Sequence, residues 1–232
     1  MTEQRVTVTI ADGVADVRLN RPDKRNALDP AMFAGLVGAG ERLKSEPGLR
    51  AVVLSGAGPD FCAGLDFGSF RAMRDGERLS AQVDLPPGRG PARATGQRAA
   101  YVWTEIPVPV IAAVTGNALG GGLQIALGAD IRIVTPDARL SVLEVAWGLI
   151  PDMTGTQLLP ELVGRDVAKE LTFTGRIVPG SPTSTRALPA TSWPRACSWP
   201  PPMPWIFREK PRRRWQCTVS AGSRPTPTGG AA

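Results

Sequence analysis

Histidine is absent from this 232-residue sequence, and its absence removes several kinds of active site. Without an imidazole the chain cannot build a Ser-His-Asp or Cys-His nucleophilic system, nor a zinc site with histidine ligands. The three cysteines, Cys62, Cys197 and Cys217, are scattered and lack metal-ligand spacing, which also argues against a disulfide framework. We therefore expect no metal site, and acid–base chemistry falls to carboxylates, lysine, tyrosine or water.

Long apolar runs are absent as well. The sequence has no stretch of about 18 apolar residues, the length that a membrane-spanning helix needs. Its first residues, MTEQRVTVTIADG, lack the basic start and the apolar stretch of a signal peptide. These observations predict a cytoplasmic protein without a membrane partner.

Acidic residues are nearly missing from the last quarter of the chain. The net charge is +6, yet the sequence up to residue 176 is close to neutral, and Glu209 is the only acid after it. A neutral body predicts no nucleic-acid partner. The alternative is that the segment REKPRRRW, residues 208–215, is a basic arm for RNA or a membrane surface.

Residues 179–232 also differ in composition, since they hold nearly half of the 23 prolines and most of the six tryptophans. Such proline density prevents a helix and interrupts strand pairing. We predict a folded core at 1–178 and a mostly disordered tail at 179–232. The abrupt change in residue usage suggests a reading-frame shift, a hypothesis that the coding DNA tests.

The preceding residues show the alternating patterns of an α/β fold. Residues 5–10 and 14–20 flank Asp12-Gly13, which predicts a β-hairpin, and residues 28–44 predict a helix with Asp29 as N-cap and Pro30 at its first position. Further strands are predicted at 50–56, 109–116, 130–135 and 138–142, and further helices at 154–164, interrupted or offset by Pro160, and at 165–173. Residues 74–98 predict a long mobile loop, either an active-site cover or a plain insertion.

Three consecutive glycines, Gly120–Gly122, separate a predicted strand from a short helix. Backbone N–H groups at a helix start lack internal partners and suit a phosphate or a developing oxyanion. The phosphate motifs GxGxxG and Walker A are absent here. The alternative is that the glycines only allow close packing. A second small-residue turn, Ala63-Gly64-Leu65, follows the predicted strand at 50–56 and exposes backbone N–H groups in the same way.

Four segments in order carry a family resemblance: NRPDKRNAL (20–28), GPDFCAGLDF (58–67), AAVTGNALGGGLQIALGADIRI (112–133) and LEVAWGLIPDMTGTQLLPELVG (143–164). Together they resemble the crotonase superfamily, also called the enoyl-CoA hydratase/isomerase superfamily, over residues 5–178. The resemblance implies a spiral of repeated ββα units, with the C-terminal helical part missing or replaced in this chain. It also implies an acyl-CoA thioester substrate that itself carries the coenzyme, so that no separate cofactor is needed, and a homotrimer or hexamer.

The resemblance further implies an oxyanion hole made by the backbone N–H groups of Leu65 and Gly121, which would stabilise an enolate. Glu144 matches the family's proton donor or base, and its apolar neighbours Val142, Leu143, Val145 and Trp147 are expected to bury it partly and raise its pKa; the alternative is a solvated acid on a strand edge. Gln124 stands where the hydratases have a second glutamate, and a glutamine cannot exchange a proton at neutral pH; the alternative is an exposed polar side chain. Asp152 resembles the aspartate that moves the distant proton in the dienoyl-CoA isomerases; the alternative is an N-cap for a helix beginning near Thr154.

The resemblance also implies which residues contact the coenzyme A part of the substrate. The matching positions are Arg25, Ala27, Ala63, Gly64, Asp66 and Phe67. Arg25 is alternatively an exposed cation, and Asp66 alternatively caps the following helix.

Three functions remain open at this point. The first is double-bond isomerisation of an unsaturated acyl-CoA, favoured because Gln124 replaces a hydratase glutamate. The second is hydration of an enoyl-CoA by Glu144 alone. The third is an inactive, poorly folded product of an altered reading frame, because the residues after 178 do not resemble the helices that cover the acyl pocket and join subunits in the family.

Overall fold

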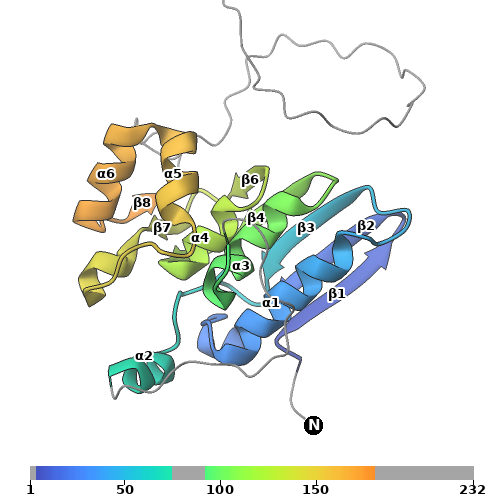
Figure 1. The fold of residues 1–232 in the computed structure, drawn as a ribbon, viewed down its shortest axis with the longest axis horizontal. Helices are drawn as coiled ribbons and strands as arrows, with labels where there is room; N and C mark the ends of the chain where they lie inside the picture. Colours follow the sequence, from blue (N-terminus) through green and yellow to red (C-terminus); the bar gives the residue numbers. More distant parts are fainter. Residues whose placement is uncertain (1–3, 75–91, 181–232) are drawn as a thin grey trace, which may run out of the picture. The chain divides into compact units, whose positions relative to one another are not determined.

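The computed structural model describes residues 4–74 and 92–180, and two β-sheets organise them (Figure 1). The larger sheet has the strand order β1-β2-β3-β4-β6, with β1 (Val6–Ala11), β2 (Val14–Leu19), β3 (Ala51–Gly56), β4 (Val110–Val114) and β6 (Ile131–Val134). The smaller sheet has the order β5-β7-β8, with β5 (Asn117–Leu119), β7 (Arg139–Ser141) and β8 (Val178–Pro179).

Helical segments lie in the connections between these strands. They are η1 (Pro22–Lys24), α1 (Pro30–Leu43), α2 (Phe67–Arg74), α3 (Thr95–Tyr101), η2 (Val102–Glu105), α4 (Gly121–Leu127), η3 (Leu143–Trp147), α5 (Gly155–Val163) and α6 (Arg165–Thr174), where η marks a 3₁₀ helix. Strands β2, β3, β4 and β6 pair in parallel, and parallel neighbours require such crossover connections. The predicted α/β class is therefore correct.

The predicted hairpin joins β1 and β2 in antiparallel register, from Val6 opposite Leu19 to Ala11 opposite Val14. Its two turn residues, Asp12 and Gly13, have φ of 50° and 75°. Positive φ at both central positions is the backbone of a type I′ turn, whose twist matches that of the flanking strands. The Asp-Gly pair thus fixes the first element of the fold.

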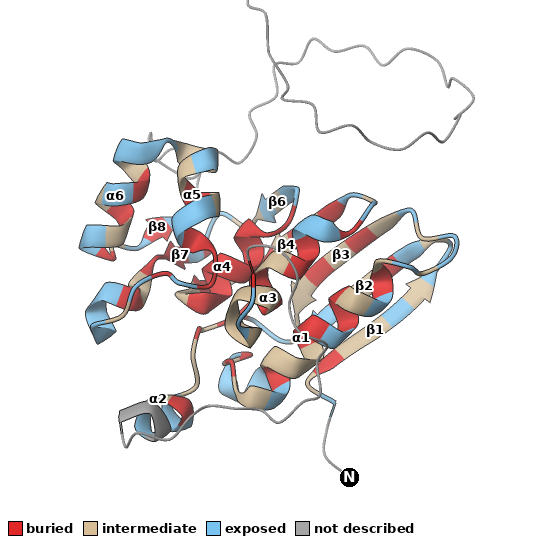
Figure 2. Cartoon of the chain, in the orientation of Figure 1, coloured by how far each residue is buried: buried red, intermediate tan, exposed pale blue. Residues whose placement is uncertain are grey.

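The core lies between the larger sheet and the helices that cover it, with α1 running alongside β1 and β2 (Figure 1). Buried and less buried residues alternate along β2 and β3, as expected for strands with one inward face (Figure 2). The apolar residues that become fully buried here include Ala15, Val17, Leu19, Met32, Leu36, Val37, Val52 and Leu54. This packing holds the carboxyl ends of β2 and β3 in place, and the site is built from the segments that follow them.

Helix α1 begins as predicted, with Asp29 as its N-cap and Pro30 at its first position. The Asp29 carboxylate accepts a hydrogen bond from the Met32 N–H at 2.7 Å and also pairs with Arg5 at 3.0 Å and Arg21 at 3.4 Å. The cap satisfies a helix N–H that has no partner within the helix, and the two ion pairs tie α1 to β1 and β2.

Replacing Asp29 by alanine is expected to lower the free energy of unfolding by about 1–2 kcal/mol, because the cap is lost. The Asp29→Asn variant keeps a capping oxygen and loses the charge, so it should lose less than Asp29→Ala. Urea unfolding of the three proteins measures both steps. An unchanged midpoint for Asp29→Ala would show that the cap contributes nothing.

Two details of the predicted elements are wrong. Pro160 lies inside the helix α5, which loses the one internal hydrogen bond that the proline N–H would have made and continues to Val163. Residues 95–98, predicted as loop, begin helix α3, where the Gln97 side chain accepts the N–H of Ala94 at 3.2 Å. Residues 75–91, the rest of the predicted loop, lie outside the described residues.

The predicted core extends to β8, where Val178 is buried and pairs with Leu140. The tail predicted at 179–232 lies outside the described residues from 181 onward. Within residues 4–74 and 92–180, none of the helices has the length and apolar character needed to cross a membrane.

Candidate active site

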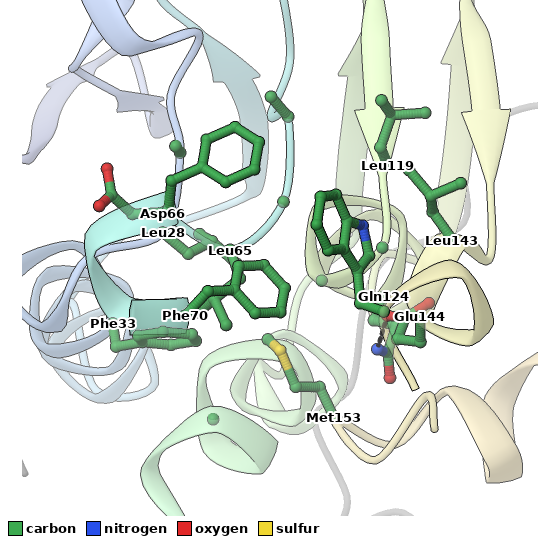
Figure 3. Close-up of a pocket in the computed structure, with 18 of the residues that line it drawn as sticks. Leu28, Phe33, Leu65, Asp66, Phe70, Leu119, Gln124, Leu143, Glu144 and Met153 are labelled. Atoms are coloured by element: carbon green, nitrogen blue, oxygen red, sulfur yellow. Dashed lines mark hydrogen bonds between the residues drawn. The ribbon is translucent and has the colours of Figure 1, made fainter. Parts of the chain in front are cut away.

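A cleft of about 900 Å³ opens between the segments that follow β3 and β5, and every predicted site residue lines it. These residues are Arg25, Ala27, Ala63, Gly64, Leu65, Asp66, Phe67, Gly121, Gln124, Glu144 and Asp152. In Figure 3, Leu28, Leu65 and Phe70 lie on one side of the cleft, Gln124 and Glu144 on the other, and Met153 between them. Five separate stretches of the chain, within residues 21–33, 63–70, 95–96, 119–124 and 143–153, thus meet at one place.

The two small-residue turns run alongside each other. Cys62 and Ala118 form a parallel bridge, with the Cys62 N–H donating to Asn117 O at 2.8 Å and the Leu119 N–H donating to Cys62 O at 3.0 Å. Leu65 and Gly121 each stand three residues beyond this bridge, so the register brings them to the same level. A Cβ built on Gly64 would lie only 3.9 Å from the Gly121 nitrogen.

The N–H of Leu65 faces away from its bridge partner Leu28. Leu28 donates to Gly64 O at 2.8 Å and accepts from the Asp66 N–H at 3.1 Å, so the polar groups of Leu65 itself point to the opposite side. Among the described residues, the Leu65 N–H has no acceptor. The positive φ of Gly64, +93°, makes this reversal of direction possible.

Gly121 is the first residue of α4, where a backbone N–H has no acceptor within the helix. A Cβ on Gly121 would come within 2.8 Å of Leu28 Cδ1, and one on Gly122 within 2.4 Å of Cys62 O. The glycine run therefore allows close packing, as the alternative interpretation held, and it also leaves the Gly121 N–H without an acceptor among the described residues. These contacts let α4 approach the 62–65 turn closely.

The Cys62 thiol between these turns is not a candidate nucleophile. It is buried, donates to Asn26 O at 3.1 Å, and burial raises its pKa to about 12. A thiol with such a pKa stays protonated at neutral pH. Among the described residues, no cluster of three acidic, cysteine or histidine side chains could hold a metal.

Glu144 lies on η3, and its side chain is only 8% exposed, so the solvated-acid interpretation is wrong. Its carboxylate faces the glycine run: a Cβ on Gly120 would lie 3.4 Å from Oε1 and 3.9 Å from Oε2. Burial raises the pKa of Glu144, and the charge of Asp152 adds to this, against hydrogen bonds from the backbone and Gln124. Val145 and Trp147, predicted to help bury the carboxylate, are exposed, and Trp147 lines the cleft instead.

Gln124 is 2% exposed on α4, so it is not a surface residue. Its Nε2 donates to Glu144 Oε1 at 2.5 Å, and its Oε1 accepts the N–H of Gly155 at 2.9 Å. The amide therefore connects η3 to the start of α5. It contacts the carboxylate without being able to exchange a proton with it.

Asp152 is exposed and lines the same cleft. The N-cap of α5 is Thr154, which makes no side-chain cap, so the capping interpretation of Asp152 is wrong. Its negative charge adds to the rise in the pKa of Glu144, which lines the same cleft.

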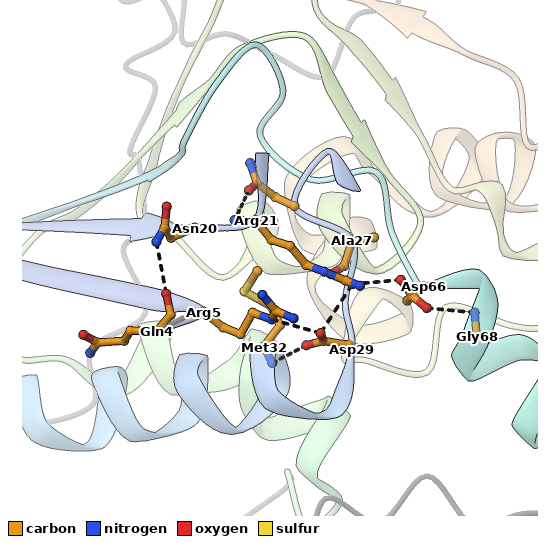
Figure 4. Close-up of polar contacts among 10 residues, drawn as sticks. Gln4, Arg5, Asn20, Arg21, Ala27, Asp29, Met32, Asp66 and Gly68 are labelled. Carbon is orange, nitrogen blue, oxygen red and sulfur yellow. Dashed lines mark hydrogen bonds and ion pairs between the residues drawn. The ribbon is translucent and has the colours of Figure 1, made fainter. Parts of the chain in front are cut away.

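The residues predicted to contact coenzyme A fall into two groups. The Asp66 carboxylate makes two structural contacts (Figure 4). It caps α2 by accepting the Gly68 N–H at 2.7 Å, and it forms an ion pair with Arg21 at 2.8 Å. This bears out its capping alternative. Arg21 also approaches Asp29, so one guanidinium joins the turn after β2 to the starts of α1 and α2.

Arg25 and Phe67 remain available on the cleft rim, each 67% exposed, with Arg25 Nε 3.8 Å from the buried Asp60. Ala27 and Ala63 also line the cleft, and the Ala63 N–H donates a hydrogen bond to Arg25 O at 2.9 Å. An exposed cation at this rim suits a phosphate group.

Sequence reasoning missed an aromatic wall. Trp147 packs against Phe67 and Phe70, with ring centroids 5.6 and 5.1 Å apart, and all three line the cleft. The signal available in the sequence was the high aromatic content of GLDFGSF together with VAWG. The reasoning also missed Gly155, whose N–H orients Gln124 and whose only sequence signal was its place at a helix start.

The sequence model described as enoyl-CoA hydratase/isomerase matches residues 9–196. The chain belongs to the enoyl-CoA hydratase/isomerase family, within the crotonase superfamily. Solved structures agree: a Thermobifida fusca YX protein solved in complex with CoA is 37% identical, with a TM-score of 0.64 over 76% of this chain and 67% of that one. The predicted crotonase fold is confirmed.

Two curated relatives show the range of the family. The mitochondrial enoyl-CoA hydratase domain-containing protein 2 of Bos taurus is 38% identical over 73% of this chain and 54% of its own. The mitochondrial Delta(3,5)-Delta(2,4)-dienoyl-CoA isomerase of Rattus norvegicus is 38% identical over 70% of this chain and 50% of its own. The family member described here thus spans about half the length of these relatives.

The charge of Asp152 gives a testable pH effect. Because this negative charge raises the pKa of Glu144, the Asp152→Asn variant is expected to lower that pKa. Titration of the Glu144 carboxyl by ¹³C NMR in both proteins, with Glu144→Gln to assign the signal, measures the shift. An inflection that stays in place or moves to higher pH would contradict the coupling.

Proposed function

We propose that this chain binds an unsaturated fatty acyl-CoA and shifts its double bond through an enolate whose oxygen is held by the Leu65 and Gly121 N–H groups. The observation that carries the proposal is the position of the Glu144 carboxylate, buried against Gly120 beside these two donors. Two backbone donors stabilise the charge that develops on the thioester oxygen when a base removes the C2 proton. The CoA-bound Thermobifida fusca relative supports the substrate class.

Isomerisation is favoured over hydration by the nature of the second residue. Hydration needs a nucleophilic water that is activated as it attacks, and Gln124 cannot take a proton from it. Isomerisation needs only one proton removed from C2 and one returned at the far end of the conjugated system. Glu144 and Asp152, two carboxyl groups on different segments of one cleft, can divide these two steps. The resemblance to a dienoyl-CoA isomerase supports this assignment.

Hydration by Glu144 alone is the second candidate, and the hydratase-named relatives favour it. Three substrates separate the two: a 2-enoyl-CoA, a 3-enoyl-CoA and a 3,5-dienoyl-CoA, each followed by absorbance. Turnover of the 3-enoyl or the dienoyl substrate supports isomerisation. Turnover of the 2-enoyl substrate only supports hydration and overturns the isomerase assignment.

The third candidate, an inactive product, predicts no turnover of any substrate. It also predicts a large polydisperse species on a sizing column, because exposed apolar surface promotes association. The trimer or hexamer that the family resemblance implies predicts a discrete species instead. The same column run on a chain with the other reading frame restored after codon 176 tests the effect of the tail.

A further inference from the structure

The buried amide of Gln124 has one possible orientation. Its Oε1 accepts the Gly155 N–H at 2.9 Å while its Nε2 donates to Glu144 Oε1 at 2.5 Å. Rotating the amide by 180° would place two N–H donors against each other at Gly155 and two oxygens against each other at Glu144. Because the side chain is nearly fully buried, water cannot relieve either conflict. Gly155 therefore determines that Gln124 is a donor toward Glu144.

The two oxygens of Glu144 are consequently not equivalent. Oε1 is occupied by the amide, whereas Oε2 is buried and has no hydrogen-bond partner among the described residues. A carbonyl oxygen accepts an N–H whether the carboxyl group is charged or neutral, provided that the proton sits on the other oxygen. Glu144 can therefore gain and lose a proton at Oε2 without breaking the hydrogen bond to Gln124, which is stronger when the carboxyl group is charged.

We infer that Gln124 and the Gly155 N–H form a positioning pair that holds Glu144 by Oε1 and reserves Oε2 for proton exchange with the substrate. The inference rests on the proposed function for its substrate and deepens it by naming the oxygen that reacts. It also explains why glutamine is suited to this position. A carboxylate there would face Glu144 Oε1 and would have to share a proton with it, which would couple the two titrations.

The space around Gly155 supports the same assignment. A Cβ on Gly155 would lie 2.7 Å from Gln124 Oε1 and 3.0 Å from Pro151 Cβ, so no larger residue fits without moving the amide. Gly155 does not line the cleft, and its effect on chemistry has to pass through Gln124. Thr156, the next residue on α5, is exposed and does not contact Gln124, which makes it a matched control.

The test uses two variants of the pair and two readouts. Gln124→Met removes the donor with similar volume, and Gly155→Ala displaces the amide while keeping it. In the protein without substrate, the Glu144 carboxyl is titrated by ¹³C NMR, with Glu144→Gln to assign its signal. Because the hydrogen bond from Gln124 favours the charged form, its loss should raise the pKa of Glu144 in both variants. The other charged group that acts on Glu144, Asp152, is unchanged in both.

The second readout is kinetic. Both variants should lose about tenfold in kcat, the size expected for one hydrogen bond to a charged group, with KM little changed. Thr156→Ala should match the wild type in both readouts, and thermal unfolding checks that each variant is folded. A Glu144 pKa that does not rise in either variant, or a raised pKa with unchanged kcat, would overturn the inference. If the wild type converts no acyl-CoA, the proposed function fails, and the titration still decides whether the pair holds Glu144.

Discussion

Replacing Glu144 by glutamine is expected to reduce kcat by roughly a thousandfold, within the range of 10²–10⁴ that positioned acid–base groups supply. The reason is the loss of the exchangeable proton, since the glutamine side chain has nearly the same size and can still accept from Gln124 Nε2. Steady-state kinetics on the substrate that the wild type converts best measures the loss.

The matching control keeps the carboxyl group and changes its reach. Glu144→Asp draws the carboxyl away from Gly120 and from the amide of Gln124, so kcat should fall and the pH–rate inflection should remain. Glu144→Gln should lose both the rate and the inflection. If Glu144→Gln reacts at the wild-type rate, residue 144 takes no part in the chemistry.

Removing the N–H of Gly121 is the second change with a large expected effect. Gly121→Pro deletes this donor at the first position of α4, where proline is tolerated within a helix. The preceding residue, Gly120, has ψ of −122°, outside the α region that a following proline disfavours. One oxyanion donor is worth about 10²–10³ in kcat, and a loss of this size is expected.

Gly121→Ala provides the comparison, because it adds the same Cβ against Leu28 and Met153 but keeps the N–H. The alanine variant controls for the Cβ, and the difference between the two variants measures replacement of the N–H by the proline ring methylene. The two variants should therefore bind CoA itself with similar affinity, whereas only the alanine variant should retain most of the turnover. Equal turnover in both would show that the Gly121 N–H is not used.

Local chemistry made part of this fold predictable. The turn at Asp12-Gly13 and the start of α1 at Asp29-Pro30 each depend on residues within about five positions, and both are present as expected. The N–H of Gly121, which has no acceptor among the described residues, was predictable for the same reason, since every helix start leaves such groups without a partner in the helix.

The pairing of Leu65 with Gly121 came from the family resemblance and not from local pattern. It depends on the bridge between Cys62 and Ala118, a contact between distant parts of the sequence that cannot be predicted from either segment by itself. The link from Gly155 through Gln124 to Glu144 was missed because it joins three elements, and periodicity does not report which helix start faces which side chain.

The burial of Val145 and Trp147 was predicted wrongly because it too depends on contacts that are distant in the sequence. Val145 and Trp147 were expected to cover Glu144 because they neighbour it in sequence and are apolar. The segment forms a 3₁₀ helix and not a strand, so consecutive side chains point in several directions and these two are exposed. Asp66, expected at the ligand from its family position, lines the cleft, and its oxygens bind Arg21 and the Gly68 N–H, contacts that local sequence does not reveal.

A crystal structure with acetoacetyl-CoA bound tests the central claim most directly, because the ligand resembles the enolate and places its thioester oxygen where charge would develop. The account predicts that this oxygen lies about 2.7–3.1 Å from both the Leu65 and the Gly121 backbone nitrogens, with Glu144 Oε2 facing C2. A thioester oxygen outside hydrogen-bonding distance of either nitrogen would contradict it.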